Sequence, residues 1–242
     1  MTLLFDLLEE SGRVENLVER GRAEVVSREP FTIRLTYSVA GLPEHPRPAE
    51  QSDPDFGGAR LLLHICCGPC ATYTVDRLRA LSWHVEGLWY NPNVQPFAEH
   101  ERRRESLESY AGQVALPMHW EEGYEMPAFL RAVAGHERFR ERCLICYRLR
   151  LERTASVARE HGFAAFTTTL VTSRHQDHAL IRAAGEAAAA AENVPFLYLD
   201  ARAAEADPRL VQMLYHQQYC GCVFSEFDRY KDTTAHLWPP PE

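Results

Sequence analysis

Cysteine is the residue type whose spacing in this sequence points most directly to chemistry. The seven cysteines fall into three groups along the 242 residues: Cys66, Cys67 and Cys70; Cys143 and Cys146; Cys220 and Cys222. A C-x-x-C pair at the start of a helix lets both sulfurs face one metal, because positions i and i+3 share a face. Four thiolates saturate a zinc ion or a cubane cluster, so seven exceed either need. The surplus indicates a cluster with a second metal or a redox-active thiol pair beside it.

Two simpler interpretations of these cysteines stay open at this point. They are a structural zinc site and a set of buried, inert thiols. A further condition concerns Cys66 and Cys67, because adjacent residues of a strand point to opposite faces. They share one centre only if the strand breaks there, and the following Gly68 and Pro69 favour such a break.

The elements that would position the cysteines alternate between strand and helix. Apolar runs closed by turn residues predict strands, and apolar residues at helical spacing predict helices. The predicted strands cover 61–66, 84–90, 114–120, 164–170 and 194–199, and the predicted helices cover 72–81, 99–111, 126–135, 143–161 and 178–191. This order predicts an α/β fold with a mostly parallel, doubly wound sheet. The first cysteine group then lies at the carboxyl end of a strand, where ligands bind in such sheets.

Three regions are expected along the chain. Residues 1–40 predict a small α+β appendage, with apolar residues at helical spacing followed by a hairpin of strands 23–26 and 31–39. Residues 41–58 hold four prolines among charged and small residues and predict an extended linker. Residues 59–242 form the predicted catalytic domain.

Composition limits the compartment and the partners. The formal charge is −8, so no global basic field recruits nucleic acid, although a local patch suffices for RNA. No apolar run approaches the roughly 20 residues of a membrane span, and the first residues lack the basic start of a signal peptide. We expect a cytoplasmic protein whose cysteines are ligands or catalysts and not disulfides, with neither a membrane nor DNA as a partner.

Five blocks of the sequence resemble one enzyme family. They are HICCGPC (64–70), YNPNVQPFAEHERRRES (90–106), ERCLICYRLRLERTA (141–155), FTTTLVTS (166–173) and QQYCGCVFS (217–225). In this order they resemble the cobalamin-independent epoxyqueuosine reductases. The resemblance implies a fold of the adenine-nucleotide-hydrolase-like (HUP) type, a [4Fe-4S] cluster and an additional iron beside it. It also implies reduction of epoxyqueuosine to queuosine at the wobble position of tRNA.

The implied chemistry suits the cysteines. Removing an epoxide oxygen to leave an alkene takes two electrons and two protons and releases water. A cluster held by cysteines reaches lower potentials than an ordinary dithiol, and a metal with an open position binds the epoxide oxygen as a Lewis acid. We therefore expect all seven cysteines to be metal ligands, without a division between cluster and iron. The expected partners are a tRNA anticodon loop carrying epoxyqueuosine and an electron-donor protein or reductant.

The remaining candidates would supply protons or bind substrate. The candidate catalytic residues are Tyr73, Asp200 and Tyr219. The candidate substrate contacts are amide, hydroxyl and cationic side chains: Tyr90, Asn91, Asn93, Arg103, Arg148, Thr168, Thr169 and Ser173. Packed aromatics, turn chemistry, β-propensity and a solvated helix face explain the same residues without function.

Two other functions compete with the reductase. A tRNA thiolase of the ATP-pyrophosphatase type needs a serine- and glycine-rich phosphate loop after the first strand of the domain. Thiols and Pro69 occupy that place here, and proline has no N–H to donate to a phosphate. A non-enzymatic zinc-binding module is the other alternative, and it would contain zinc and be colourless.

Overall fold

A four-stranded parallel sheet forms the centre of the second of two compact units, Pro54–Glu242, in a computed structural model. Its strands are β3 (Arg60–His64), β4 (His84–Trp89), β5 (Met118–Trp120) and β6 (Ala165–Thr168), in the order β5-β4-β3-β6. All three neighbouring pairs are parallel. The predicted α/β fold with a mostly parallel sheet is confirmed.

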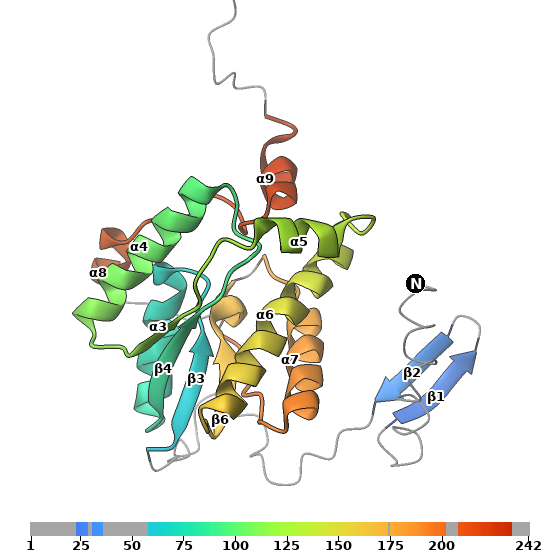
Figure 1. Cartoon of the computed structure of the whole chain (residues 1–242), viewed down its shortest axis with the longest axis horizontal. Coiled ribbons are helices and arrows are strands. Elements are labelled where there is room, and N and C mark those ends of the chain that lie inside the picture. The colour runs from blue at the N-terminus through green and yellow to red at the C-terminus, as the bar shows by residue number, and fades with distance from the viewer. Residues whose placement is uncertain (1–22, 29–30, 36–57, 174, 202–207, 234–242) are drawn as a thin grey trace, which may run out of the picture. The chain divides into compact units, whose positions relative to one another are not determined.

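Helices cover both faces of this sheet (Figure 1). Helices α3 (Gly68–Ala80) and α4 (Phe97–Gln113) lie on one face, and α6 (Glu141–Glu160) and α7 (His178–Glu192) lie on the other. Leu61 and Leu63 of β3 enter the core on the α3 side, whereas Leu62 enters the core on the α6 side. A strand that is buried on both faces has a continuous run of apolar residues, and this run allowed β3 to be predicted from the sequence.

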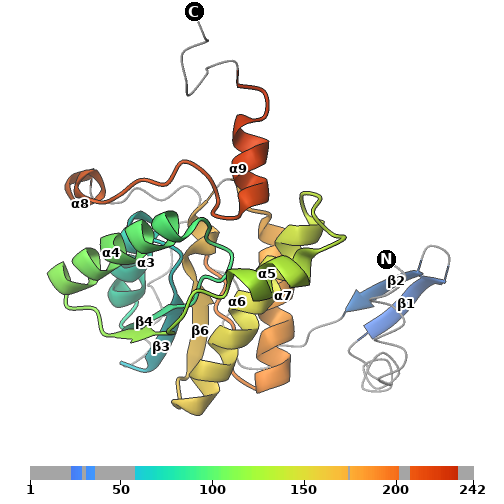
Figure 2. The same ribbon diagram turned by 45° about the horizontal axis from the view of Figure 1, so that its top comes forward.

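The order of the strands reverses at β3, because β4 lies on one side of it and β6 on the other. In open α/β sheets the crevice for a ligand forms at such a switch point, outside the carboxyl ends of the strands. Cys66 follows β3 and Thr169 follows β6, so the two residues meet there. Figure 2 shows α9 (Val223–Tyr230) and α5 (Met126–Val133) near this end of the sheet.

Some predicted elements differ in extent from those observed. The predicted strand 194–199 makes only a single parallel bridge, between Phe166 and Phe196. The predicted strand 164–170 ends at Thr168, because its side chain accepts a hydrogen bond from the Leu170 amide and starts the 3-10 helix η1 (Thr169–Thr172). The helices α8 (Pro208–Met213) and α9 are additional.

The structure describes residues 23–28, 31–35, 58–173, 175–201 and 208–233. In the first unit, Met1–Asp53, strands β1 (Ala23–Arg28) and β2 (Phe31–Leu35) pair antiparallel, as the predicted hairpin requires. The predicted helix before residue 23 and the linker up to residue 57 lie outside the described residues. Within the described part, no helix is both long and apolar enough to cross a lipid bilayer.

Candidate metal centre

The first cysteine group forms a compact cluster of sulfurs at the turn from β3 into α3. The Sγ atoms of Cys66, Cys67 and Cys70 all lie within 4.8 Å of one another, and those of Cys66 and Cys67 are 3.8 Å apart. The chain turns there because α3 begins at Gly68, directly after Cys67. A Cβ atom at Gly68 would lie 2.8 Å from Ser106 Oγ, so glycine lets α3 approach α4. The break predicted after Cys67 therefore exists.

One of these thiols is readily ionised and the other two are not. Hydrogen bonds from Cys67 and Cys70 lower the pKa of Cys66 well below its ordinary value. The same coupling to Cys66 raises the pKa of Cys67 and raises that of Cys70 to about 12. The Thr169 hydroxyl donates a further hydrogen bond of 3.3 Å to Cys66 Sγ. Three sulfurs this close together suit a metal cation, which displaces the thiol protons when it binds.

The other four cysteines come from the start of α6 and from the loop before α9. Cys146 and Cys222 are buried in one apolar cluster with Phe129 and Val133. Burial raises the pKa of Cys146 to about 12, and Cys220, Cys222 and Cys143 contribute as neighbouring charges. Among the described residues, only Cys66, Cys67 and Cys70 lie close enough together to hold one metal ion, whereas these four cysteines are neighbours of one another and supply further soft ligands of the kind that metals and iron-sulfur clusters take.

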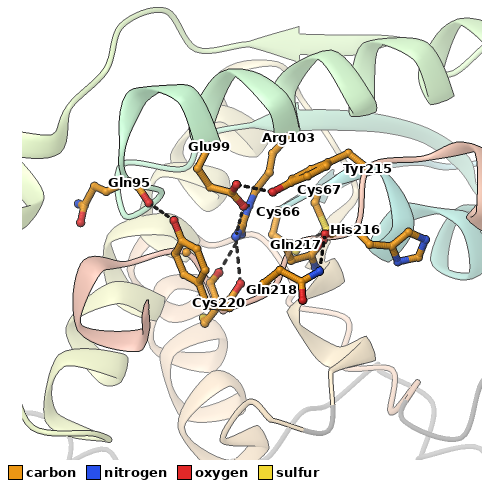
Figure 3. A network of polar contacts seen from close by, with 12 residues as sticks. Cys66, Cys67, Gln95, Glu99, Arg103, Tyr215, His216, Gln217, Gln218 and Cys220 are labelled. Carbon is orange, nitrogen blue, oxygen red and sulfur yellow. Dashed lines mark hydrogen bonds and ion pairs between the residues drawn. The ribbon is translucent and has the colours of Figure 1, made fainter. Parts of the chain in front are cut away.

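A buried arginine holds the loop that carries Cys220 (Figure 3). Arg103 of α4 is 1% exposed and forms an ion pair of 2.7 Å with Glu99. Its Nη1 and Nη2 atoms donate hydrogen bonds of 2.9 Å to the carbonyl oxygens of Cys220 and Tyr219. Tyr215 donates a hydrogen bond of 2.5 Å to Glu99, so the loop is tied to α4 at several points.

The segment before α4 holds the same loop from a second side. The Gln95 amide donates to the Gly221 carbonyl oxygen at 2.9 Å, and the Val223 amide donates to Gln95 Oε1 at 3.2 Å. The Tyr219 hydroxyl donates to the Gln95 carbonyl oxygen. Between the two cysteines, Gly221 has a φ of +141°, which favours glycine. The turn between Cys220 and Cys222 is therefore fixed by neighbouring residues.

The prediction that Arg103 binds a phosphate is wrong. Its side chain is buried, and its donors are taken by Glu99 and by the two carbonyl groups. Arg148 differs, because its side chain is 44% exposed and its Nε lies 3.2 Å from Glu152 Oε1. Arg148 therefore stays available to a ligand in solution.

The hydroxyl and amide candidates lie around the switch point. The Thr169 hydroxyl forms hydrogen bonds with the backbone amide and with the sulfur of Cys66. The Thr168 hydroxyl lies 2.8 Å from His64 Nδ1. Asn91 donates a hydrogen bond of 2.9 Å to the Ile65 carbonyl oxygen and so supports the end of β3. Asn93 is also buried. The Ser173 hydroxyl accepts a hydrogen bond from the His175 amide.

The candidate acids have different surroundings. The Tyr90 hydroxyl donates to Glu125, and burial, followed by this hydrogen bond, raises the pKa of Tyr90 to about 12. Burial also raises the pKa of Tyr219. Tyr73 is half-buried against the core on the α6 side, and Asp200 is exposed.

Three side chains contact the thiols although no role at the metal site was predicted for them. Gln176 Nε2 lies 3.0 Å from Cys220 Sγ, and Gln217 Nε2 lies 3.7 Å from Cys70 Sγ. Arg150 Nη2 donates a hydrogen bond of 3.1 Å to Cys146 Sγ. Only Arg150 carried a usable signal, because it lies one helical turn after the C-x-x-C pair.

Comparison with known proteins agrees with this geometry. The family model described as epoxyqueuosine reductase QueH matches residues 61–228, which include all seven cysteines. Epoxyqueuosine reductase QueH of Dehalococcoides mccartyi is 36% identical over 174 residues, covering 71% of this chain and 94% of that protein. The protein of the same name from Thermotoga maritima is 33% identical over 179 residues, covering 70% and 91%.

Proposed function

The chain belongs to the epoxyqueuosine reductase QueH family, and we propose that it reduces epoxyqueuosine to queuosine at the wobble position of tRNA without cobalamin. The observation that carries this proposal is the compact cluster of Cys66, Cys67 and Cys70 at the carboxyl end of β3, with the cysteines of the two other groups in its neighbourhood. The reaction removes the epoxide oxygen as water and takes up two electrons and two protons.

The thiols fit the metal groups that this chemistry needs. We assign the seven cysteines collectively to a [4Fe-4S] cluster and an additional iron. When bound, these groups supply low-potential electrons and a Lewis-acid position for the epoxide oxygen. The protein's own part is to hold the ligands: Thr169 fixes Cys66, and Arg103 fixes the turn that carries Cys220.

Protons must reach the substrate from nearby side chains. Tyr73, Asp200 and Tyr219 are the proposed donors. Because burial raises its pKa, Tyr219 keeps its proton at neutral pH. Its hydroxyl already donates to the Gln95 carbonyl oxygen, so it must break that bond before it can serve the substrate. Tyr90, Asn91, Asn93, Thr168, Thr169 and Ser173 are the proposed contacts to the modified base.

The wobble base reaches a recessed site only when it is extruded from the anticodon loop. Arg148 is the proposed phosphate contact, and its matched control is Arg182, which also forms an exposed i,i+4 pair with a glutamate. We expect Arg148→Glu to weaken tRNA binding at moderate salt without changing the iron content, whereas Arg182→Glu should leave both unchanged. Equal affinities of the two variants would remove Arg148 from the tRNA contacts.

The test of the proposed function starts with anaerobic purification. We expect a brown protein with several irons and acid-labile sulfide per chain, and queuosine formation on tRNA that contains epoxyqueuosine when a low-potential reductant is supplied. A colourless protein that contains zinc and forms no queuosine would support the zinc module. Thiolation of tRNA with ATP would support the thiolase.

A further inference from the structure

Arg150 is a buried cation without a carboxylate partner. The described residues include three buried arginines, Arg103, Arg142 and Arg150. Arg103 pairs with Glu99 and Arg142 pairs with Asp228, but no carboxylate of the described chain lies within ion-pair distance of Arg150. Arg150 is 1% exposed, so water does not balance its charge. A buried charge of this kind is costly unless another group compensates it.

The groups around Arg150 are thiols from all three cysteine groups. Its Nη2 atom donates to Cys146 Sγ at 3.1 Å, and its Nε atom donates to the Cys146 carbonyl oxygen at 3.2 Å. The neighbours that favour its charged form include Cys220 and Cys66 as well as Cys146. Arg150 therefore lies where the cysteine groups from β3, from α6 and from the C-terminal loop approach one another.

The neighbouring histidine does not share this role. His64 is fully buried, with Nδ1 2.8 Å from Thr168 Oγ1 and Nε2 3.2 Å from the Tyr90 carbonyl oxygen. Both ring nitrogens of His64 therefore face oxygen atoms and not the thiols. Arg150 thus supplies the fixed positive charge beside the thiols.

We propose that Arg150 is the counter-charge of the metal centre, a positioning residue that compensates the negative charge of the metal-bound thiolates and holds Cys146 in place. This inference rests on the metal-holding part of the proposed function. Its consequence is a difference between two states of the protein: Arg150 costs stability while the site holds no metal and stabilises the protein once the thiolates bind metal. An arginine that merely fills space would affect both states alike.

The experiment compares Arg150→Met with Arg150→Lys and with the control Arg159→Met, which replaces an exposed arginine on the same helix. Each protein is purified metal-free without oxygen and titrated with Co²⁺, whose thiolate charge-transfer absorption reports cysteine ligation. We expect Arg150→Met to weaken Co²⁺ binding about 10- to 100-fold, as loss of an outer-shell partner does. Arg150→Lys should recover part of this loss, and Arg159→Met should match the wild type.

Thermal melts and redox titrations separate this role from simple packing. Metal-free Arg150→Met should melt at or above the wild-type temperature, while the Co²⁺-loaded variant should melt below it. After reconstitution with iron and sulfide, the midpoint potential of Arg150→Met should be more negative, because a positive charge near the cluster has been removed.

Several outcomes would overturn the inference. They are unchanged Co²⁺ affinity in Arg150→Met, a metal-free variant that does not fold, or a wild-type protein that shows no thiolate absorption with Co²⁺. If the wild type binds Co²⁺ through thiolates and the variants behave as expected, but no queuosine is formed, the inference stands and the proposed function falls.

Discussion

The Arg103 guanidinium donates a hydrogen bond of 2.9 Å to the carbonyl oxygen of Cys220, a residue 117 positions later in the chain. The contact joins α4 to the loop that brings the last two cysteines to the site. The guanidinium also donates to the Glu99 carboxylate and to the Tyr219 carbonyl oxygen. The protein itself therefore holds the loop before any metal binds. Arg103 is therefore a buried residue that positions the loop of Cys220 and Cys222.

Replacing Arg103 should damage both stability and metal retention. Arg103→Met leaves the Glu99 carboxylate buried without its cation, and breaking a buried pair in this way costs about 3–5 kcal/mol. Urea unfolding measures that loss, and an iron count after anaerobic purification measures retention. Arg104→Met is the control, because Arg104 is 43% exposed and its pair with Glu108 contributes at most about 1 kcal/mol. Equal iron content in the two variants would contradict the role of Arg103 in holding the loop that carries Cys220.

Gly221 should be intolerant of even one methyl group. A Cβ atom there would lie 3.0 Å from Asn93 Nδ2 and 3.2 Å from Arg103 Nη1, and the φ of +141° is unfavourable for any other residue. We expect Gly221→Ala to lower the iron retained per chain and to destabilise the fold by about 1–3 kcal/mol.

Gly112 provides the matched control for that substitution. It lies inside α4, and a Cβ atom there meets nothing within 4 Å. Gly112→Ala should keep the full iron content and stabilise the protein by up to about 1 kcal/mol, because alanine favours a helix. A Gly221→Ala protein that behaves like Gly112→Ala would show that the turn between the cysteines adapts.

Local sequence patterns predicted the features of the site that depend on neighbouring residues. The apolar run of β3 followed by Cys66, Cys67, Gly68 and Pro69 located the strand, its break and the first cysteine group. The C-x-x-C pair was placed correctly in the first turns of α6. In both cases residues within a few positions of one another determine the structure.

Features that depend on tertiary contact were not predictable in this way. Arg103 stands in a run of three arginines that resembles a solvated helix face. Only the folded chain shows that its side chain turns inward to Cys220. The segment 194–199 has the composition of a strand, but the sheet extends to it only through Phe196. Composition does not determine how many residues of an edge segment pair with the sheet.

A pH dependence of stability should come from Glu86, at the opposite end of β4 from the cysteines. Burial raises the pKa of Glu86, but hydrogen bonds from Arg60 at 2.8 Å and His119 at 2.9 Å outweigh it and lower the pKa below 4.5. At a pH between the folded-state and the unfolded-state pKa of Glu86, the unfolded chain binds more protons than the folded chain. The stabilisation is therefore complete above about pH 4.5 and is lost as the pH falls through the folded-state value.

The variant Glu86→Gln removes this contribution. Urea unfolding of the metal-free protein should show the wild type more stable than Glu86→Gln at pH 7, with the difference shrinking below pH 4.5. Glu108→Gln, which breaks only an exposed pair with Arg104, should lose less stability at pH 7 than Glu86→Gln. A wild-type advantage over Glu86→Gln that is the same at pH 3.5 and pH 7 would contradict this assignment.

The hydrogen bonds between Thr169 and Cys66 should contribute both to the stability of the fold and to the affinity for metal. The Thr169 hydroxyl accepts a hydrogen bond of 3.1 Å from the Cys66 amide and donates one of 3.3 Å to its sulfur. Thr169→Val removes the hydroxyl and with it both hydrogen bonds. The buried Cys66 amide is then left without this acceptor, which should lower the free energy of unfolding by about 1–3 kcal/mol. It should also weaken Co²⁺ binding about tenfold, because the ligand loses its outer-shell partner. Thr169→Ser keeps the hydroxyl and should stay close to the wild type.

Thr167, two residues earlier in β6, provides the control. It is equally buried, and its hydroxyl donates to the Leu197 carbonyl oxygen at 2.6 Å, so Thr167→Val also loses a buried hydrogen bond. Because this bond does not involve a cysteine, Thr167→Val should lose stability and keep its Co²⁺ affinity. If both valine variants lose affinity in proportion to their stability, Thr169 acts through the fold alone and has no specific effect on the Cys66 sulfur.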